Sequence, residues 1–271
     1  MELIQSFLLG LLQGIAEFLP ISSSGHLILA RAFLGADLEP GITFEIVVHF
    51  GSFMSIIVYY RKMIMELITD FFASLTPTAL KEGRMLKNDN ARMCLYIVIS
   101  MIPAMIVGFA LKDAIEELFM NPFFISAMLV VTGCILFSTK FVGDTDKEIN
   151  GTRALLMGVV QALAIVPGIS RSGSTISAGL YSGLNRDAVA NFSFLMVLPV
   201  LGGAMILEVG EIYESGIEMA AIVSLGVGFF ASFVSGYFAL SYLIKILKHE
   251  KFHYFSYYCW AIGIIGMVYF Y

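Results

Sequence analysis

Long apolar runs alternate along the chain with short polar connections, and their length predicts helices that cross a bilayer. A run of about 17–25 apolar residues can cross a hydrocarbon core as a helix, and none of these runs alternates with a period of two, as the strands of a membrane barrel do. Six spans are predicted, over residues 42–60, 93–111, 122–139, 188–207, 219–244 and 254–271. The predicted fold class is all-α, a polytopic membrane protein with a single integral domain over residues 1–271.

Two segments interrupt this pattern. GLLQGIAEFLPISSSG at residues 10–25 and GVVQALAIVPGISRSG at residues 158–173 align without a gap. In each, an apolar run leads to a proline, followed by hydroxyl side chains and glycine where a membrane helix should continue. The chain is therefore an internal duplication, with repeats over about residues 1–141 and 150–271.

The distribution of Lys and Arg predicts how the spans are oriented, because cytoplasmic connections carry an excess of these residues. Residues 61–92, 140–153 and 245–251 are basic connections, whereas residues 112–121 and 208–218 hold one basic residue and none. Counting crossings leaves residues 3–38 and 154–185 as re-entrant helical hairpins, the first entering from outside and the second from the cytoplasm. Each repeat then has one hairpin and three spans, which gives an inverted topology. The alternative is that the prolines only kink long helices.

Composition agrees with a bilayer environment. Hydrophobic residues make up 58% of the chain and charged residues only 14%, too few to cover a soluble surface. The net charge of −5 argues against nucleic acid as a partner. Three cysteines without a C-x-x-C spacing suggest neither a disulfide framework nor a zinc site. Membrane lipids are the expected surroundings.

The first interruption carries a concentrated set of polar side chains. Gln13 and Glu17 are four residues apart, so they share one helical face. A carboxylate inside a membrane is costly unless a cation or a proton relay compensates for it, which makes Glu17 a candidate site residue. Ser22 and Ser23 resemble an N-cap that opens a half-helix suited to an anion, and His26 lies in its first turn. The plainer interpretation is that the serines only cap and His26 only packs.

The second interruption contains the most specific chemical signal in the chain. Ser170, Arg171, Ser172 and Thr175 place a guanidinium among hydroxyls beside two glycines. This combination suits phosphate oxygens, because Arg donates as a fork and glycine permits close backbone approach. Alternatively, Arg171 reaches the membrane interface or pairs structurally with Glu17. In either case Arg171 and Glu17 are expected to be close.

Glu45 and His49 are also four residues apart, within the predicted span 42–60. They are second-rank candidates, which either line the same cavity or pair with each other.

Together these groups predict phosphoanhydride hydrolysis on a lipid phosphate. A carboxylate with an amide neighbour can hold a divalent metal, Arg and hydroxyls can hold phosphate, and a Ser or His can attack or move a proton. The alternative class is an inverted-repeat secondary transporter or a polyprenyl-phosphate flippase, because binding sites between broken helices are also a transport design.

The run from Gln13 to His26, with Glu17-Phe-Leu-Pro-Ile-Ser-Ser-Ser-Gly-His26, and the run Pro167-Gly-x-Ser-Arg-Ser closely resemble the paired motifs of the undecaprenyl-diphosphate phosphatases. The resemblance implies a bacitracin-resistance enzyme of the inner membrane that recycles the cell-wall carrier lipid, with its site open to the external, periplasmic face. It also implies Mg²⁺ or Ca²⁺ near Glu17 and Gln13, and a possible homodimer. In this comparison Ser23 and His26 are rival nucleophile or acid/base candidates, while Ser170, Arg171 and Thr175 bind the diphosphate. Position 13 is Gln here where many members have Glu.

Overall fold

The computed structural model describes residues 3–34, 42–143, 146–215 and 221–271, and all named elements in these parts of the chain are helices. The predicted all-α class is therefore confirmed. Residues 35–38 of the first predicted hairpin and residues 219–220 of the fifth predicted span lie outside the described residues. The six predicted spans correspond to α3 (Ile42–Tyr59), α7 (Asp89–Ala110), α9 (Pro122–Ser138), α12 (Arg186–Ser215), α13 (Ala221–Lys248) and α14 (Phe255–Tyr269).

Not all six helices are long enough to cross a bilayer. Four described segments meet the length and hydropathy that a span requires, namely Asp89–Ala110, Pro122–Phe141, Arg186–Ile206 and Ile222–Lys248. A fifth is reached only if α3 and α4 (Arg61–Ser74), which are bent by 76°, are counted as one broken span. At 15 residues, α14 is only about 22 Å long. The described residues therefore hold four or five candidate spans, and the number six stays a prediction.

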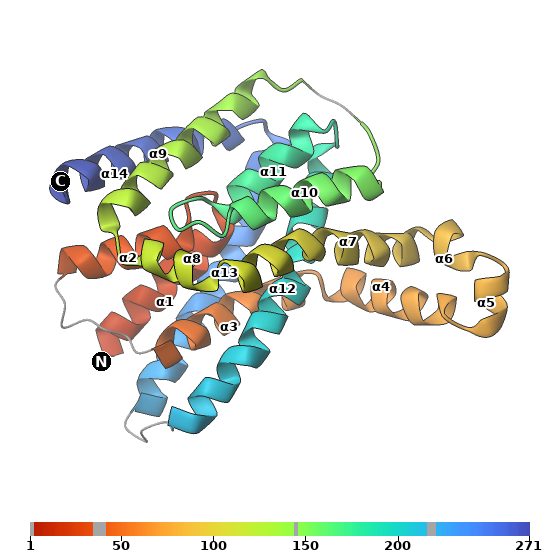
Figure 1. Cartoon of the computed structure of the whole chain (residues 1–271), viewed down its shortest axis with the longest axis horizontal. Coiled ribbons are helices and arrows are strands. Elements are labelled where there is room, and N and C mark those ends of the chain that lie inside the picture. The colour runs from red at the N-terminus through yellow and green to blue at the C-terminus, as the bar shows by residue number, and fades with distance from the viewer. Residues whose placement is uncertain (1–2, 35–41, 144–145, 216–220) are drawn as a thin grey trace.

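Each interrupted segment folds as two short helices joined by a bent tip. The first pair is α1 (Leu3–Phe18) and α2 (Ser23–Leu34), and the second is α10 (Gly151–Leu163) and α11 (Arg171–Tyr181). Helices of this length reach roughly 16–24 Å, less than the ~30 Å of a hydrocarbon core. The two tips lie side by side near the middle of the molecule (Figure 1), where Ser172 Oγ lies 3.5 Å from the carbonyl oxygen of Leu19.

The end of α1 is anchored in the main hydrophobic core. Phe18 is fully buried, and its ring meets that of Phe194 in α12 edge to face, with the ring centroids 5.9 Å apart. Buried aromatic pairs of this kind add to the stability that comes from burial alone. Because Phe18 follows Glu17 directly, this packing fixes where the Glu17 side chain leaves the helix.

Glycines allow the hairpins to pack closely on helices of the other half of the chain. A Cβ atom at Gly10 in α1 would collide with the backbone of Gly228 in α13, and one at Gly158 in α10 with the backbone of Ser100 in α7. Small residues permit such close approach between membrane helices. Gly10 and Gly158 occupy the same position in the two aligned segments, and both make a close contact with the backbone of another helix.

Hydrogen bonds from the other half also hold each tip. Thr132 in α9 donates from Oγ1 to the carbonyl oxygen of Gly168 (2.9 Å) and accepts from the backbone N–H of Ser170 (3.0 Å). Cys259 in α14 lies with its sulfur 3.7 Å from the carbonyl oxygen of Pro20. Pro20 and Gly168 are aligned positions, so the last helix of each half supports the tip of the other half.

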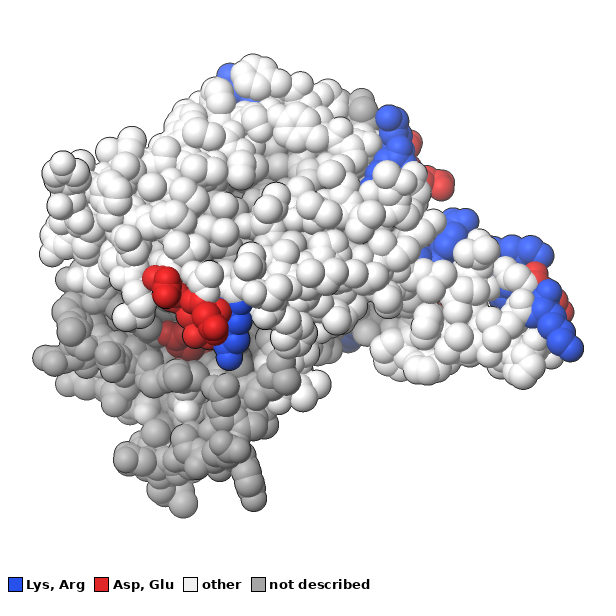
Figure 2. Space-filling model, in the orientation of Figure 1, with Lys and Arg blue, Asp and Glu red and all other residues white. Residues whose placement is uncertain are grey.

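The remaining elements are α4, α5 (Pro77–Lys81), α6 (Arg84–Lys87), α8 (Lys112–Phe119) and two short 3₁₀ turns, η1 (Thr139–Phe141) and η2 (Phe252–Tyr254). Helices α4 to α6 form an arm that projects with the start of α7 from one end of the molecule (Figure 1). Most visible Lys and Arg side chains gather on this arm and at the same end, with a few Asp and Glu side chains among them (Figure 2). The largest visible group of Asp and Glu lies on the other half of this face, beside a basic side chain.

Candidate active site

Glu17 is the centre of a hydrogen-bond network that joins the two tips. Its Oε1 atom accepts a hydrogen bond from Nη2 of Arg171 at 2.6 Å. Its Oε2 atom accepts from Oγ of Ser23 at 2.7 Å and from Nε2 of Gln13 at 3.1 Å. The expectation that Glu17 and Arg171 lie close together is therefore confirmed. Both carboxylate oxygens are oriented by partners from three different helices.

Two members of this network, Ser23 and Arg171, lie in the first turns of helices. Ser23 opens α2 and Arg171 opens α11, and each is preceded by a serine that caps the helix. Ser22 Oγ accepts from the backbone N–H of Gly25 at 3.4 Å, and Ser170 Oγ accepts from that of Gly173 at 3.1 Å. The predicted N-cap at the first tip is thus confirmed, and Ser170 caps α11 in the same way. Two helix N-termini, each with the partial positive charge of its free N–H groups, therefore flank Glu17.

A small cavity of about 70 Å³ lies between the tips. It is lined by Ala16, Glu17, Ser22, Ser23, Ser24, Ala164, Ile169, Ser170 and Arg171. Two buried polar atoms of the network, Oε1 of Gln13 and Nη1 of Arg171, have no hydrogen-bond partner among the described residues. Buried polar atoms are rarely left without partners. The unpaired acceptor and donor are therefore suited to a small, charged ligand that the network is built to receive.

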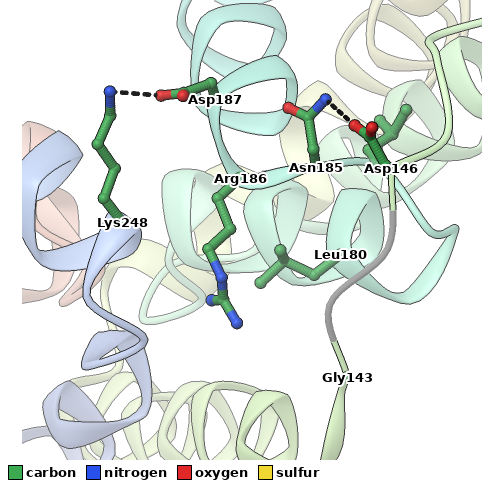
Figure 3. A pocket seen from close by; sticks show the side chains of 8 residues that line it. Gly143, Asp146, Leu180, Asn185, Arg186, Asp187 and Lys248 are labelled. Carbon is green, nitrogen blue, oxygen red and sulfur yellow. Dashed lines mark hydrogen bonds and ion pairs between the residues drawn. The ribbon is translucent and has the colours of Figure 1, made fainter.

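The larger cavity shown in Figure 3, of about 600 Å³, has different chemistry. Lys248 Nζ lies 2.8 Å from Oδ1 of Asp187, and Asn185 Nδ2 donates to Oδ1 of Asp146 at 2.9 Å. The charges of Lys248 and Asp187 are therefore paired with each other, Asp146 is bonded to an amide, and the lining residues all lie outside the two tips. Size alone does not identify the site, and the small cavity is the better candidate.

His26 has both ring nitrogens engaged. Nδ1 lies 2.9 Å from the carbonyl oxygen of Ser22, and Nε2 lies 2.9 Å from the hydroxyl of Tyr258. A carbonyl oxygen can only accept, so Nδ1 carries the hydrogen, and in the neutral ring Nε2 accepts from Tyr258. His26 is buried at the back of the first tip and stands outside the described cavity lining. In this arrangement both ring nitrogens are hydrogen-bonded to other residues of the protein.

Two predicted phosphate ligands of the second tip, Ser172 and Thr175, stand outside the described lining of the cavity. Thr175 Oγ1 lies 2.6 Å from the hydroxyl of Ser193 and also donates to the carbonyl oxygen of Arg171. Ser172 lies with its hydroxyl 3.3 Å from that of Ser170 and donates to the first tip at Leu19. The structure therefore brings Ser170 and Arg171 to the cavity and places Thr175 and Ser172 behind them.

The second-rank candidates Glu45 and His49 lie in α3, one helix away from the tips. His49 uses Nδ1 to donate to the backbone carbonyl of Glu45 at 2.8 Å, which is a contact within the helix. Among the described residues, the lining of the 70 Å³ cavity includes neither of them.

For a metal ion, the tips offer oxygen donors but no complete cage. No group of three or more His, Cys, Asp or Glu gathers among the described residues. The carboxylate of Glu17 and the unpaired Oε1 of Gln13 are one helical turn apart and are the hard donors that Mg²⁺ and Ca²⁺ take. Since Mg²⁺ commonly uses one or two carboxylates with phosphate oxygens and water, this pair fits a divalent ion that is held jointly with a phosphate ligand.

Comparison with known proteins gives matches over nearly the whole chain. Residues 6–265 match the family described as bacitracin resistance protein BacA. An undecaprenyl-diphosphatase of Salinibacter ruber is 39% identical over 97% of each chain. Those of Methanosphaera stadtmanae and Halothermothrix orenii are 38% and 37% identical, over 99% of this chain and 98% of theirs.

Proposed function

Since the chain belongs to the bacitracin resistance protein BacA family, we propose how its two tips carry out the reaction for which its relatives are named. The protein is an undecaprenyl-diphosphate phosphatase of the membrane, which hydrolyses undecaprenyl diphosphate to undecaprenyl phosphate and inorganic phosphate. The product is the carrier lipid for cell-wall synthesis, and its recycling accounts for the link to bacitracin resistance. The observation that carries the mechanism is the hydrogen bond between Ser23 and Glu17.

In the proposed mechanism, Ser23 is the nucleophile and Glu17 is its general base. Ser23 already donates its hydroxyl hydrogen to Oε2 of Glu17, which is the arrangement that activates a serine. As Oγ bonds to the terminal phosphorus, the proton passes to Glu17 and the bond to the bridging oxygen breaks, so undecaprenyl phosphate leaves. Glu17 then releases this proton to water and, as a base again, takes a proton from the water molecule that attacks the phosphoserine. The bond from phosphorus to Ser23 Oγ breaks, Glu17 returns that proton to Oγ, and inorganic phosphate is released.

The phosphate oxygens are held by the groups that open α2 and α11. Arg171 contributes the unpaired Nη1 atom, and Ser170 lines the cavity beside it. Free N–H groups of the two helix N-termini add donors that favour a dianionic group. These donors outnumber the single negative charge of Glu17, so the site is suited to the terminal phosphate of a diphosphate.

Glu17 and Gln13 would hold the divalent ion. Such an ion supplies neutralisation of charge on the diphosphate when it is bound. Their own part is to orient the bound diphosphate against Ser23, while Gln13 Nε2 keeps the Glu17 carboxylate in place.

The membrane arrangement is part of the same proposal. We propose that the halves over residues 1–141 and 150–271 are inverted repeats, each with a re-entrant hairpin and three spans, and that the site opens to the external face of the inner membrane. The shared contacts of Gly10 and Gly158, the short hairpin helices and the basic arm support this arrangement. A homodimer, which only the resemblance implies, is tested by the mass of the protein in detergent.

Phosphate release by the purified protein in detergent tests the function, because no gradient exists there and a transporter or flippase alone releases none. Ser23→Ala should abolish release from undecaprenyl diphosphate. Ser182→Ala is the matched control, because Ser182 follows the last residue of α11 and its hydroxyl bonds back to the carbonyl oxygen of Gly179.

Mapping of a trapped phosphoryl group decides between Ser23 and His26 as the nucleophile. An acid-stable phosphate on Ser23 supports the mechanism, whereas an acid-labile phosphate on His26 would contradict it.

A further inference from the structure

Helix α14 contacts the back of the first tip through two consecutive residues, Tyr258 and Cys259. The Tyr258 hydroxyl donates to Nε2 of His26 at 2.9 Å, and the two rings stack with an interplanar angle of 11° and centroids 5.5 Å apart. The Cys259 sulfur lies 3.7 Å from the carbonyl oxygen of Pro20. The first part of α14 therefore contacts the tip before Ile21, at Pro20, and after it, at His26.

The backbone at this point needs such support. Ser22 has a φ angle of 69°, in the left-handed region that side chains other than glycine rarely adopt. Its carbonyl oxygen accepts from the His26 ring at 2.9 Å and from the His26 backbone N–H at 3.1 Å. Unusual backbone conformations at functional sites persist only where their surroundings hold them. The two hydrogen bonds from His26 support the left-handed conformation of Ser22.

Packing alone does not fill the space behind the tip. Tyr258, Leu19 and Ile21 line an apolar cavity of about 500 Å³ on this side. Ile21 itself is buried in the main hydrophobic core, so packing holds this residue, whereas the polar groups of the turn depend on hydrogen bonds. The hydrogen bonds from His26 and Cys259 add a directional restraint to this packing, and the His26 ring is itself held by the Tyr258 hydroxyl.

We propose that Tyr258 is a positioning residue for the reaction, which acts on Ser23 through His26. By donating to Nε2, Tyr258 holds the imidazole in the tautomer whose Nδ1–H binds the Ser22 carbonyl. This bond keeps the left-handed turn at Ser22, and Ser23, the next residue, is thereby aimed at Glu17. The inference rests on the proposed role of Ser23 as the nucleophile, and adds that the contacts of Tyr258 and His26 orient this residue.

Tyr258→Phe removes one hydroxyl and keeps the ring, so it isolates this hydrogen bond. We expect kcat to fall by roughly tenfold to a hundredfold, since small misplacements of reacting groups cost rates of this order, while KM changes by less than about twofold because the phosphate ligands are untouched. Tyr254→Phe is the matched control, because Tyr254 lines the same cavity, and its ring contacts lie with His253 and Tyr257. It should leave kcat unchanged.

A double-mutant cycle tests whether Tyr258 acts through His26. In a His26→Ala background, Tyr258→Phe should cause no further loss of kcat. An additive loss would overturn the proposal, as would a rise in KM with unchanged kcat, which would place Tyr258 in contact with the substrate.

A spectroscopic measurement separates this proposal from the proposed function. In protein labelled with ¹⁵N at its histidines, His26 should show a fixed Nδ1–H tautomer that is lost in Tyr258→Phe. This measurement needs no turnover. It therefore tests the contact between Tyr258 and His26 even if Ser23→Ala remained active and the proposed nucleophile were wrong. An unchanged tautomer in a folded Tyr258→Phe variant would contradict the proposal directly.

Discussion

Glu17 and Arg171 form a buried ion pair between two helices that are 154 residues apart in the sequence, with 2.6 Å between Oε1 and Nη2. Their side chains are only 8% and 14% exposed. Breaking a buried pair by removing one partner typically costs about 3–5 kcal/mol, because the other charge is left uncompensated. Alanine variants of either residue therefore change the packing of the two tips together with the chemistry. Conservative substitutions keep the packing, and because Glu17→Gln still removes one charge of the pair, the melting temperature of each variant is measured together with its activity.

Glu17→Gln keeps the shape of the side chain and removes its capacity to act as a base. We expect turnover to fall by about 10²–10⁴-fold, the usual contribution of a general base, with undecaprenyl diphosphate still bound. Phosphate release and equilibrium binding are the measurements. Glu66→Gln on the exposed face of α4 is the control and should have full activity. Near-normal turnover in Glu17→Gln would show that another group accepts the proton.

Arg171→Lys retains the charge but loses the planar fork. Lysine cannot both pair with Glu17 and offer a second, fixed donor in the place of Nη1. We therefore expect KM to rise and kcat/KM to fall by about 10²-fold, while the melting temperature in detergent changes little. Arg84→Lys on the exposed arm provides the comparison. A normal KM in Arg171→Lys would mean that this guanidinium only holds Glu17.

Much of the fold follows from hydrophobic patterning, because helix positions in a membrane protein are set by where apolar runs begin and end. The predicted span 122–139 agrees within one residue with α9, which runs from Pro122 to Ser138. Patterning does not reveal the bend near Tyr60, where α3 turns by 76° into α4. The polar residues 61–92 were predicted as a connection, but they form helices that pair with the start of α7, and only tertiary contacts determine that pairing.

The candidate site, too, could be predicted from the sequence only in part. The proximity of Glu17 and Arg171 is predictable, since an isolated charge in a membrane needs a partner. Tyr258 gives no such signal, because it belongs to an aromatic run that is also typical of a membrane interface. Its role depends on which face of α14 meets the first tip. Likewise, Thr175 looks like a phosphate ligand in the motif, and only the structure shows its hydroxyl engaged by Ser193.

The metal requirement can be tested at position 13. Gln13→Glu adds a second carboxylate one turn from Glu17, and affinity for Mg²⁺ and Ca²⁺ rises with the number of charged ligands. We expect the half-saturating Mg²⁺ concentration to fall by about tenfold and Mg²⁺ to raise the melting temperature more than in the natural protein. Gln13→Met keeps the volume without the oxygen and should do the reverse. Equal Mg²⁺ dependence in all three proteins would argue against a cation at this position.

The close helix contacts at Gly10 and Gly158 give a test of the internal symmetry that does not depend on activity. A methyl group at either position would meet backbone atoms, of Gly228 or of Ser100 respectively, and backbone cannot move aside as a side chain can. We expect Gly10→Ala and Gly158→Ala each to destabilise the protein by about 1–3 kcal/mol, the usual cost of overpacking. Gly108→Ala in α7, where an added Cβ meets no described atom within 4 Å, should be neutral or slightly stabilising, since Ala favours helix. Thermal unfolding in detergent measures all three. If only one of the two aligned glycines were sensitive, the two hairpins would not be held by equivalent contacts.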